Sequence, residues 1–454
     1  MANKIYFIGI GGAGTSMLAR IYKNIGYDVL GSDEGDGFYT EGLKKEGIRV
    51  FDKFNKDNLN VKNIEFVVYS TAYDESNIEM RECRKKGIRL ISYPEAVGKL
   101  TKKYKTIAVC GTHGKTTTTA MTSFGLEGSG ILSTTLVGSV VNGWNGGVKI
   151  GDSEYFVLEA DEYQNKLGFY SPFIVVLTSM DYDHPDFFNN FEEYKNAFND
   201  FVQKIPKDGM LVACIDDKNV RNFLNDLDLN AVTYGFSKDA DVLILKNYYR
   251  NSYNVIEFLF EGKAYKLEIV APGKHNAQNA VAAWIVGNIV SGNNQSNKVS
   301  EGIKKFYGIK RRFERIGSYK GAMLFDDYAH HPKEIEATIK ASRDVFPDKE
   351  LIIAFHPHTF SRTEALFDEF TDVLGLADKV LLLDIYGSAR ESVGNITALD
   401  IVNTINSKYS DKSVYVKDFS GLKKWLEDNL DLNKVFFSMG AGDIWKIHNL
   451  LIDK

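Results

Sequence analysis

The stretch Thr106-Ile-Ala-Val-Cys-Gly-Thr-His-Gly-Lys-Thr-Thr-Thr118 indicates the fold class most directly, because an apolar strand runs into a glycine-containing loop and a predicted helix. Backbone amides in such a loop surround phosphates, while Lys115 can reach the β- and γ-phosphate oxygens and the Thr116 hydroxyl can bind Mg²⁺. The full phosphate-loop pattern has a glycine where this chain has Val109, so the loop is a shortened variant. The residues predicted to contact a bound nucleotide are Gly111, Thr112, His113, Gly114, Lys115, Thr116 and Thr117.

A second glycine pattern, Gly9-Ile-Gly-Gly-Ala-Gly14, follows a short apolar run near the N-terminus. Asp33 stands at the end of the next predicted strand. The glycines allow a tight turn, and the N-terminus of the following helix offers unpaired amides and a positive dipole to a diphosphate. By itself the pattern leaves two ligand classes open, a dinucleotide such as NAD or FAD and a nucleotide sugar.

Two acidic clusters follow predicted strands in the middle of the chain. Leu158-Glu-Ala-Asp-Glu162 ends the strand Tyr155–Leu158, and Asp181-Tyr-Asp-His-Pro-Asp186 follows the strand Ile174–Leu177. Side chains at the carboxyl ends of parallel strands face the crevice in which open α/β sheets bind ligands. Mg²⁺ prefers a few carboxylates, water and substrate phosphates. Each cluster alone is typical of a solvated loop, but with the phosphate loop they indicate a magnesium site.

Composition excludes several classes of protein. Of 454 residues, 44% are hydrophobic and 25% charged, which is ordinary globular usage. Lys and Arg total 55 against 60 Asp and Glu, so no basic excess supports non-specific binding of nucleic acid. Three cysteines are too few for a disulfide framework, and no apolar stretch approaches the roughly 18–20 residues that span a bilayer. We predict a soluble cytoplasmic protein with neither nucleic acid nor membrane as a partner.

The order of predicted elements indicates three α/β domains, in line with roughly 150 residues per domain. We place them at residues 1–103, 104–308 and 309–454. The charged segment Lys99–Lys105 is predicted to be a linker between the first two domains, because it is too polar for a core. In the third domain, apolar residues at 3.6-residue spacing predict one continuous helix over Thr363–Leu376.

The motifs, taken in order, resemble those of the Mur ligase family, the ATP-dependent amide-forming enzymes of peptidoglycan precursor synthesis. This resemblance implies an α/β fold of three domains: a Rossmann-like N-terminal domain that binds UDP, a central phosphate-loop ATPase domain with a parallel sheet, and a Rossmann-like C-terminal domain that binds the acceptor. The matching motifs cover essentially the whole chain: GIGGAG (9–14), GTHGKTTTT (111–119), EADE (159–162), DHPD (183–186), GKHNAQNA (273–280), RRFE (311–314), DDYAHHP (326–332), HPHTFSRT (356–363), LDIYGSARE (383–391) and MGAGDI (439–444).

The resemblance also favours a nucleotide sugar over NAD at the first glycine pattern, since a dehydrogenase has no need of a second phosphate loop. An NAD-dependent oxidoreductase would leave Lys115, Glu159 and His184 without roles, and their presence also argues against an inactive nucleotide-binding regulator. The residues that the resemblance assigns to the UDP part of the substrate are Gly9, Gly11, Gly12, Ala13, Gly14, Ser32, Asp33, Ser70, Thr71 and Ala72.

Family chemistry implies that ATP phosphorylates the lactyl carboxylate of UDP-N-acetylmuramate and that the acceptor amine then displaces phosphate from the acyl phosphate. Lys115 and one Mg²⁺, held by Thr116 and Glu159, would neutralise the moving phosphoryl group. His184 would hold a second Mg²⁺. The residues assigned to ATP outside the phosphate loop are His275, Asn276, Asn279, Arg312 and Asp327, and those assigned to the acceptor are His330 and Arg362.

The acceptor itself stays open between two kinds of molecule. The chain most resembles the branch that adds L-alanine, which usually has an arginine where this chain has Thr359. Glu162-Tyr163 instead resembles the recycling branch that adds a whole tripeptide to the same nucleotide sugar. Several Mur ligases carry a carbamylated lysine, but the matching region here reads Asn196-Ala-Phe198. We expect UDP-N-acetylmuramate and a small L-amino acid as substrates, and a monomer or weak homodimer.

Overall fold

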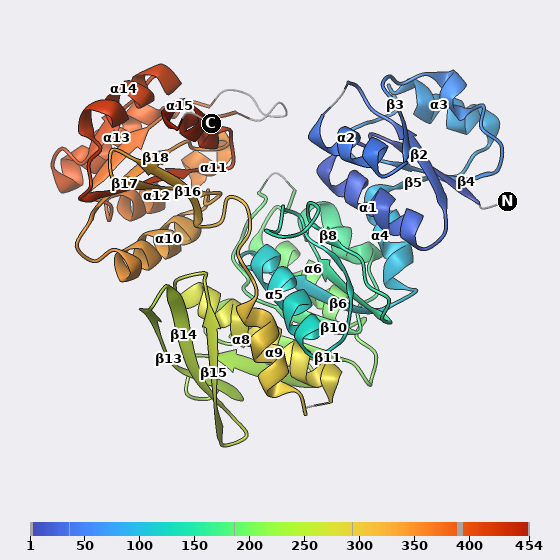
Figure 1. Cartoon of the computed structure of the whole chain (residues 1–454), viewed down its shortest axis with the longest axis horizontal. Coiled ribbons are helices and arrows are strands. Elements are labelled where there is room, and N and C mark those ends of the chain that lie inside the picture. The colour runs from blue at the N-terminus through green and yellow to red at the C-terminus, as the bar shows by residue number, and fades with distance from the viewer. Residues whose placement is uncertain (1–2, 36, 186, 293, 388–393, 453–454) are drawn as a thin grey trace. The chain divides into compact units, whose positions relative to one another are not determined.

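The computed structural model describes residues 3–35, 37–185, 187–292, 294–387 and 394–452. The chain forms two compact units, the first made of residues 1–243 and 279–306 and the second of residues 244–278 and 307–454. The described residues build three mostly parallel sheets of five, ten and six strands, which confirms the predicted three-part α/β fold (Figure 1). Within the described ranges, no helix is long and apolar enough to cross a membrane.

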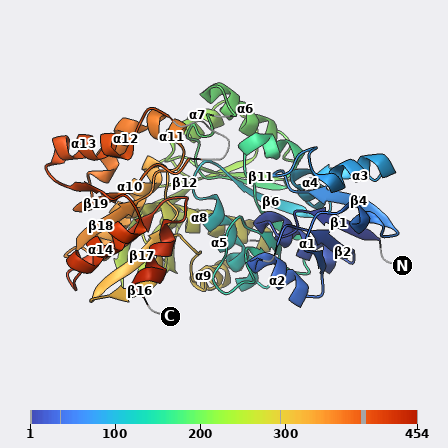
Figure 2. The same ribbon diagram turned by 90° about the horizontal axis from the view of Figure 1, so that it is seen from above.

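The five-stranded sheet is wholly parallel, in the order β3-β2-β1-β4-β5. Apolar residues of α1, α2 and α4 pack on one face, and α3 covers the other, so α1 and α3 lie on opposite sides (Figure 2). Because β1 lies between β2 and β4, the strand order reverses there, and open α/β sheets bind ligands beyond the carboxyl ends of the strands at such a point. The elements are β1 (Lys4–Ile8), α1 (Ala13–Asn24), β2 (Asp28–Ser32), α2 (Phe38–Lys45), β3 (Arg49–Phe51), η1 (Lys56–Leu59), β4 (Ile64–Tyr69), α3 (Ile78–Lys86), β5 (Leu90–Ser92) and α4 (Tyr93–Thr101).

The ten-stranded sheet has the order β15-β14-β13-β12-β11-β10-β6-β9-β7-β8, with a parallel centre and antiparallel pairs β7–β8 and β14–β15. Its central strand β10 is an unbroken apolar run that is buried at every position, as expected for a parallel strand covered on both faces. The elements are β6 (Lys105–Cys110), α5 (Lys115–Gly128), β7 (Thr134–Leu136), β8 (Val148–Lys149), β9 (Tyr155–Glu159), η2 (Tyr163–Phe169), β10 (Ile174–Leu177), α6 (Phe191–Val202), β11 (Met210–Cys214), α7 (Lys218–Leu224), β12 (Ala231–Gly235), β13 (Val242–Arg250), β14 (Tyr253–Phe260), β15 (Lys263–Ile269), α8 (Lys274–Ser291) and α9 (Ser296–Lys304).

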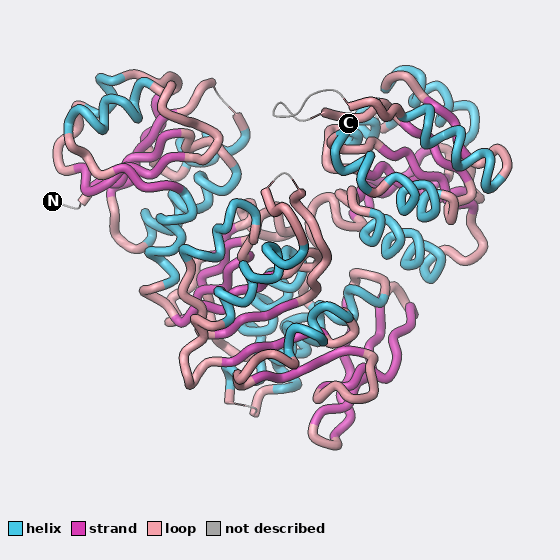
Figure 3. Tube along the Cα trace, turned by 180° about the vertical axis from the view of Figure 1, so that it is seen from behind, coloured by secondary structure: helices cyan, strands magenta, loops and turns pink. Residues whose placement is uncertain are grey.

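The six-stranded sheet has the order β16-β17-β21-β18-β19-β20, parallel except for the β16–β17 hairpin. Apolar residues of α10, α12 and α13 pack on one face and those of α14 and α15 on the other, so that helices flank the strands (Figure 3). The elements are β16 (Glu314–Tyr319), β17 (Ala322–Asp327), α10 (Pro332–Val345), β18 (Glu350–Phe355), α11 (Phe360–Ala365), α12 (Phe367–Leu374), β19 (Lys379–Leu382), α13 (Ala398–Tyr409), β20 (Ser413–Tyr415), α14 (Phe419–Asn429), β21 (Lys434–Met439), η3 (Ile444–Lys446) and α15 (Ile447–Leu451).

Two local predictions were wrong. The segment Lys99–Lys105 is not a linker, because α4 runs to Thr101 and β6 begins at Lys105. Its lysines point outward while Leu100 and Thr101 are almost fully buried, so an amphipathic helix end resembles a polar connection in the sequence. The predicted helix Thr363–Leu376 is two helices, α11 and α12, because Leu366 between them leaves helical geometry (φ −118°, ψ 29°).

Candidate active site

The phosphate loop joins β6 to α5 and needs glycine at both ends. Gly111 (φ +121°) and Gly114 (φ +84°) adopt backbone angles that other residues rarely reach, and a Cβ on Gly114 would lie 2.6 Å from Asn279 Oδ1. The same oxygen accepts a hydrogen bond from Thr118 Oγ1 at 3.1 Å. Asn279, which comes from a distant part of the sequence, therefore lies directly against the loop.

Lys115 begins α5 and is folded back over the loop. Its Nζ donates to the carbonyl oxygens of Gly111 (2.6 Å) and Thr112 (3.1 Å), and lies 3.1 Å from Glu162 Oε2. Burial alone would lower the pKa of Lys115, but the nearby carboxylates, Glu162 first among them, outweigh burial and raise the pKa well above its ordinary value. The side chain is thus a cation held beside the loop, where phosphate oxygens can replace its present partners.

The rest of the loop is anchored to the segment after β10. His113 Nε2 lies 3.2 Å from Asp181 Oδ2, and the His113 amide donates to Ser179 Oγ at 2.9 Å. Thr112 Oγ1 accepts a hydrogen bond from the Asp181 amide at 2.7 Å. Thr117 is half-buried on the first turn of α5. These bonds hold the loop to the strand end from which His184 follows.

Thr116 and Glu159 form a pair of oxygen donors at the start of α5 and the end of β9. Thr116 Oγ1 donates to Glu159 Oε1 at 2.7 Å, and the other carboxylate oxygen accepts from the Gly138 amide. A hydroxyl and a carboxylate beside a phosphate loop are the ligand types that Mg²⁺ takes together with substrate phosphate and water. The structure therefore brings together two of the three predicted metal ligands, and their chemistry fits the ion.

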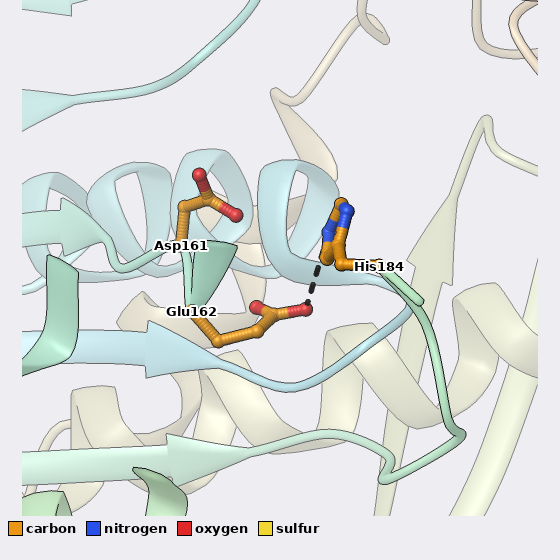
Figure 4. Close-up of side chains that lie close together, drawn as sticks. All are labelled: Asp161, Glu162 and His184. Carbon is orange, nitrogen blue, oxygen red and sulfur yellow. Dashed lines mark ion pairs between the residues drawn. The ribbon is translucent and has the colours of Figure 1, made fainter. Parts of the chain in front are cut away.

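The third predicted ligand, His184, lies in a different group. Asp161, Glu162 and His184 place one ligand atom each within 4.8 Å of one another, and Figure 4 shows Glu162 and His184 directed toward each other. His184 Nε2 is 3.9 Å from Glu162 Oε1. Burial by itself would raise the pKa of Asp161. The positive charges of Lys166 and Lys115 outweigh burial, so the pKa of Asp161 is below its ordinary value. Two carboxylates and an imidazole also fit a divalent cation.

Glu162 was missed as a site residue in the sequence. It is fully buried and pairs with Lys115, which makes it the carboxylate that holds the phosphate-loop lysine. The signal that could have found it is its position three residues after Glu159, still at the carboxyl end of β9. Strand geometry cannot say which acidic side chain of such a cluster turns inward.

The first glycine loop lies beyond β1, at the point where the strand order reverses. The amides of Gly9 and Ile10 donate to Ser32 O at 2.9 and 3.0 Å, and the Gly11 amide donates to Asp33 Oδ2 at 2.6 Å. Tyr73 covers the loop, because a Cβ on Gly9 would lie 2.4 Å from the Tyr73 ring. The residues at the N-terminus of α1 are exposed or half-buried, namely Gly12, Ala13 and Gly14.

Some of the other residues predicted to contact UDP are exposed to solvent, and one, Ser32, is buried. Thr71 and Ala72 are exposed, and Ser70, whose amide donates to Ile8 O at 3.0 Å, brings them to the carboxyl end of β1. Ser32 is fully buried and its hydroxyl donates to Glu79. A direct contact between the Ser32 side chain and a ligand would require this bond to be exchanged, whereas its carbonyl already supports the glycine loop.

In the second unit, Asp327 ends β17 and accepts hydrogen bonds from the amides of Phe313 (2.9 Å) and Ala329 (2.8 Å). Burial raises the pKa of Asp327 to about 6. Arg312 Nη1 lies 3.6 Å from Glu334 Oε1. Asn276, near the start of α8, donates to Pro272 O at 2.8 Å, and His275 beside it is half-buried.

The residues assigned to the acceptor also belong to the second unit. His330 Nδ1 lies 3.0 Å from Tyr328 O, and burial lowers the pKa of His330 to about 4, so the imidazole is neutral near pH 7. Arg362 is half-buried on α11. Thr359, which precedes α11, has φ +69°, a costly angle for a β-branched residue. The motif at 383–391 lies partly outside the described residues.

Three family models match consecutive parts of the chain. The "Mur ligase family, catalytic domain" matches residues 4–105, the "Mur ligase middle domain" residues 109–287, and the "Mur ligase, glutamate ligase domain" residues 311–442. The chain belongs to the Mur ligase family. The family predicted from the motifs is thereby confirmed, and with it an ATP-dependent ligase of peptidoglycan biosynthesis.

Individual Mur ligases match over their full length. The UDP-N-acetylmuramate–L-alanine ligases of Caldanaerobacter subterraneus subsp. tengcongensis and Alkaliphilus metalliredigens are each 37% identical, over 99% of this chain and 97% and 96% of theirs. Among solved structures, the UDP-N-acetylmuramate-alanine ligase of Thermotoga maritima has a TM-score of 0.79 at 27% identity, covering 99% of this chain and 98% of that one. A murein peptide ligase from Psychrobacter arcticus shares the fold, with a TM-score of 0.68 at 22% identity over 99% and 98% of the two chains.

Proposed function

We propose that this Mur ligase uses ATP to join L-alanine to the lactyl carboxylate of UDP-N-acetylmuramate through an acyl phosphate. The observation that carries the proposal is full-length likeness to ligases of that name, at 37% identity over 99% of the chain. The geometry supports it, because a phosphate loop with a half-buried lysine and two groups of metal-type donors serves phosphoryl transfer.

The phosphate loop binds the β- and γ-phosphates of ATP through its amides. The phosphates draw Lys115 Nζ away from the Gly111 and Thr112 carbonyls, and the ammonium then neutralises charge on the group in transfer. Thr116 and Glu159 would hold one Mg²⁺, and His184 would hold a second, with Glu162 Oε1 3.9 Å from its Nε2. Bound Mg²⁺ supplies further neutralisation of phosphate charge. Asn279, His275, Asn276, Arg312 and Asp327 contact the rest of ATP.

The N-terminal glycine loop holds the UDP part of the substrate. The amides of Ala13, which is exposed, and Gly14, which is half-buried, would receive the diphosphate at the start of α1. Asp33, which accepts a hydrogen bond from the Gly11 amide, orients the loop. In the second unit, His330 and Arg362 receive the amino acid. A neutral His330 does not repel the amine, and the Arg362 guanidinium can pair with the acceptor carboxylate.

The domain limits 1–103, 104–308 and 309–454 are part of the same proposal, together with a monomer or weak homodimer. They are supported by the sheet limits, because the first sheet ends at Ser92, the second runs from Lys105 to Ile269 and the third begins at Glu314. Limited proteolysis followed by mass spectrometry tests the boundaries. We expect cleavage near residue 308 and, at the first boundary, in the short exposed turn at Lys102 and Lys103 between α4 and β6.

Release of phosphate from ATP in the presence of UDP-N-acetylmuramate and Mg²⁺ tests the function, with a panel of acceptors. We expect release with L-alanine and formation of the matching amide by mass spectrometry. Coupling of the L-alanyl-γ-D-glutamyl tripeptide but of no single amino acid would replace the proposal by the recycling reaction. That alternative has the Glu162-Tyr163 pair in its favour, and the Tyr163 ring lies 4.6 Å from that of His184.

A further inference from the structure

Helix α6 carries one hydroxyl on an otherwise phenylalanine-lined face. Tyr194 stands among aromatic positions three to seven residues away, and its ring lies 5.1 Å from that of Phe198 and 5.2 Å from that of Phe188. Tyr194 is fully buried. Phenylalanine would pack equally well there, and burying a hydroxyl costs free energy unless the hydroxyl is bonded. The position of the hydroxyl therefore has to be explained by its partners.

Those partners are two residues of the ATP site. Tyr194 OH lies 3.0 Å from Glu162 Oε1 and 2.7 Å from Thr112 Oγ1. Tyr194 donates its single hydroxyl proton to Glu162 Oε1. The single proton of Thr112 Oγ1 can go either to Tyr194 OH or to the Asp181 carbonyl oxygen, which lies 2.8 Å away. Burial and the Glu162 carboxylate raise the pKa of Tyr194 well above its ordinary value, so the phenol keeps that proton.

The bonds close a ring through the phosphate loop. Glu162 Oε2 lies 3.1 Å from Lys115 Nζ, and Lys115 Nζ returns to the carbonyl of Thr112 at 3.1 Å. Glu162 is fully buried, and its carboxylate lies between a neutral donor on one oxygen and a cation on the other. Without Tyr194 OH, Lys115 Nζ would be the remaining donor to this carboxylate among the hydrogen bonds described. The carboxylate could then turn about its last torsion and move with the ammonium, which would leave Lys115 less well placed.

We propose that Tyr194 is a positioning residue for phosphoryl transfer, which fixes Glu162 so that Lys115 stays at the phosphate loop. The inference rests on the proposed function, because Lys115 is assigned there to the moving phosphoryl group. When ATP displaces Lys115 Nζ from the loop carbonyls, Glu162 remains fixed by Tyr194. The carboxylate then determines the position from which the Lys115 ammonium contacts the phosphate. No bond to substrate is required of Tyr194.

The test is Tyr194→Phe, with Tyr22→Phe as a matched control. Tyr22 is a buried tyrosine whose hydroxyl donates to Ala96 O at 2.8 Å, so the control loses a buried hydrogen bond outside the ATP site. We expect kcat of Tyr194→Phe to fall about tenfold, as for loss of one hydrogen bond to a charged group, with the KM for ATP within about twofold. Tyr22→Phe should keep the wild-type kcat. Equal kcat in wild type and Tyr194→Phe would overturn the proposal.

A double variant separates positioning from a general loss of structure. If Tyr194 acts through Glu162, Tyr194→Phe combined with Glu162→Gln should be no slower than Glu162→Gln alone. If the two losses multiply, Tyr194 acts independently of the carboxylate and the inference is wrong.

A third measurement does not depend on ligase activity. The rate at which acetic anhydride acetylates Lys115 in the absence of ATP, followed by mass spectrometry, reports how firmly Glu162 holds the ammonium. It should rise about twofold or more in Tyr194→Phe and stay unchanged in Tyr22→Phe. An unchanged rate at Lys115 contradicts the positioning role, whereas a wild type that makes no amide but shows the expected labelling contradicts the proposed function alone.

Discussion

The two glycine loops of the first unit have similar backbone geometry but carry different side chains. Each follows a buried parallel strand, uses a glycine of positive φ (Gly9 and Gly111) and leads into a helix. At the first position of that helix stands Lys115 in one loop and Ala13, the counterpart, in the other. The carboxylates of Glu162, Asp161 and Glu159 act on Lys115. Asp33, beside the first loop, instead accepts hydrogen bonds from the amides of Gly11 and Glu34 and from the Tyr73 hydroxyl.

This difference separates two tasks that anion-binding loops perform. Backbone amides and a helix dipole hold an anion whose charge stays in place, such as a diphosphate that only tethers a substrate. Charge that moves during a reaction needs a mobile cation and metal ligands directed at the transition state. The first loop has only the former features, and the second has both.

Removing Lys115 should have the largest effect of any change at either loop. Lys115→Ala deletes the cation directed at the transferring phosphoryl group, so kcat should fall by about 10³ or more while circular dichroism stays that of a folded protein. Lys105→Ala is the matched control, since Lys105 begins the same region and pairs with Glu154 at the surface. Near-normal turnover of Lys115→Ala would remove the distinction between the loops.

The metal ligands should come next. Glu159→Ala and His184→Ala should each lower kcat about 10²-fold, because each removes one of the donors assigned to Mg²⁺. Binding of Mn²⁺ by electron paramagnetic resonance should weaken in both variants, and a chelator should stop the wild-type reaction. If a chelator leaves the rate of the wild-type reaction unchanged, the proposal of two Mg²⁺ ions is wrong.

A change at the first glycine loop should affect binding rather than turnover. Asp33→Ala leaves the Gly11 amide without its partner, so the KM for UDP-N-acetylmuramate should rise about tenfold with kcat nearly unchanged. Hydrogen exchange at residues 9–14 should slow with UDP-N-acetylmuramate and not with NAD. Protection by NAD alone would reassign this loop to a dinucleotide.

The smallest expected effect concerns an anion that neither loop binds, the acceptor carboxylate. Thr359 offers one neutral hydrogen bond where an arginine would offer two charged ones, a difference of about 1–2 kcal/mol. Thr359→Arg should therefore lower the KM for L-alanine severalfold, and replacing a β-branched residue at φ +69° should not lower Tm. Thr359→Lys adds a positive charge but not the planar guanidinium that can donate two parallel hydrogen bonds, so it should lower the KM for L-alanine less than Thr359→Arg does. If Thr359→Arg leaves the KM for L-alanine unchanged, the acceptor carboxylate does not bind near residue 359.

Much of the fold could be predicted from the sequence, because local chemistry specifies it. The apolar runs at Lys4–Ile8 and Ile174–Leu177 form strands, and the glycines at 9–14 and 111–114 form the loops that their spacing indicates. The predicted linker at Lys99–Lys105 was wrong because polarity at alternate helical positions does not exclude burial of Leu100. The break at Leu366 left no glycine or proline as a signal.

The sequence alone determined which residue types follow which strands, and therefore the family, the two loops and the acidic clusters. Only the tertiary structure decided which of those carboxylates turns inward, since Glu159 meets Thr116 whereas Glu162 meets Lys115 across more than forty residues of chain. It also brought Tyr194, which no motif contains, to the same carboxylate. The physical reason is that spacing along the chain specifies the face of a strand or helix, whereas a hydrogen bond depends on where two distant elements pack.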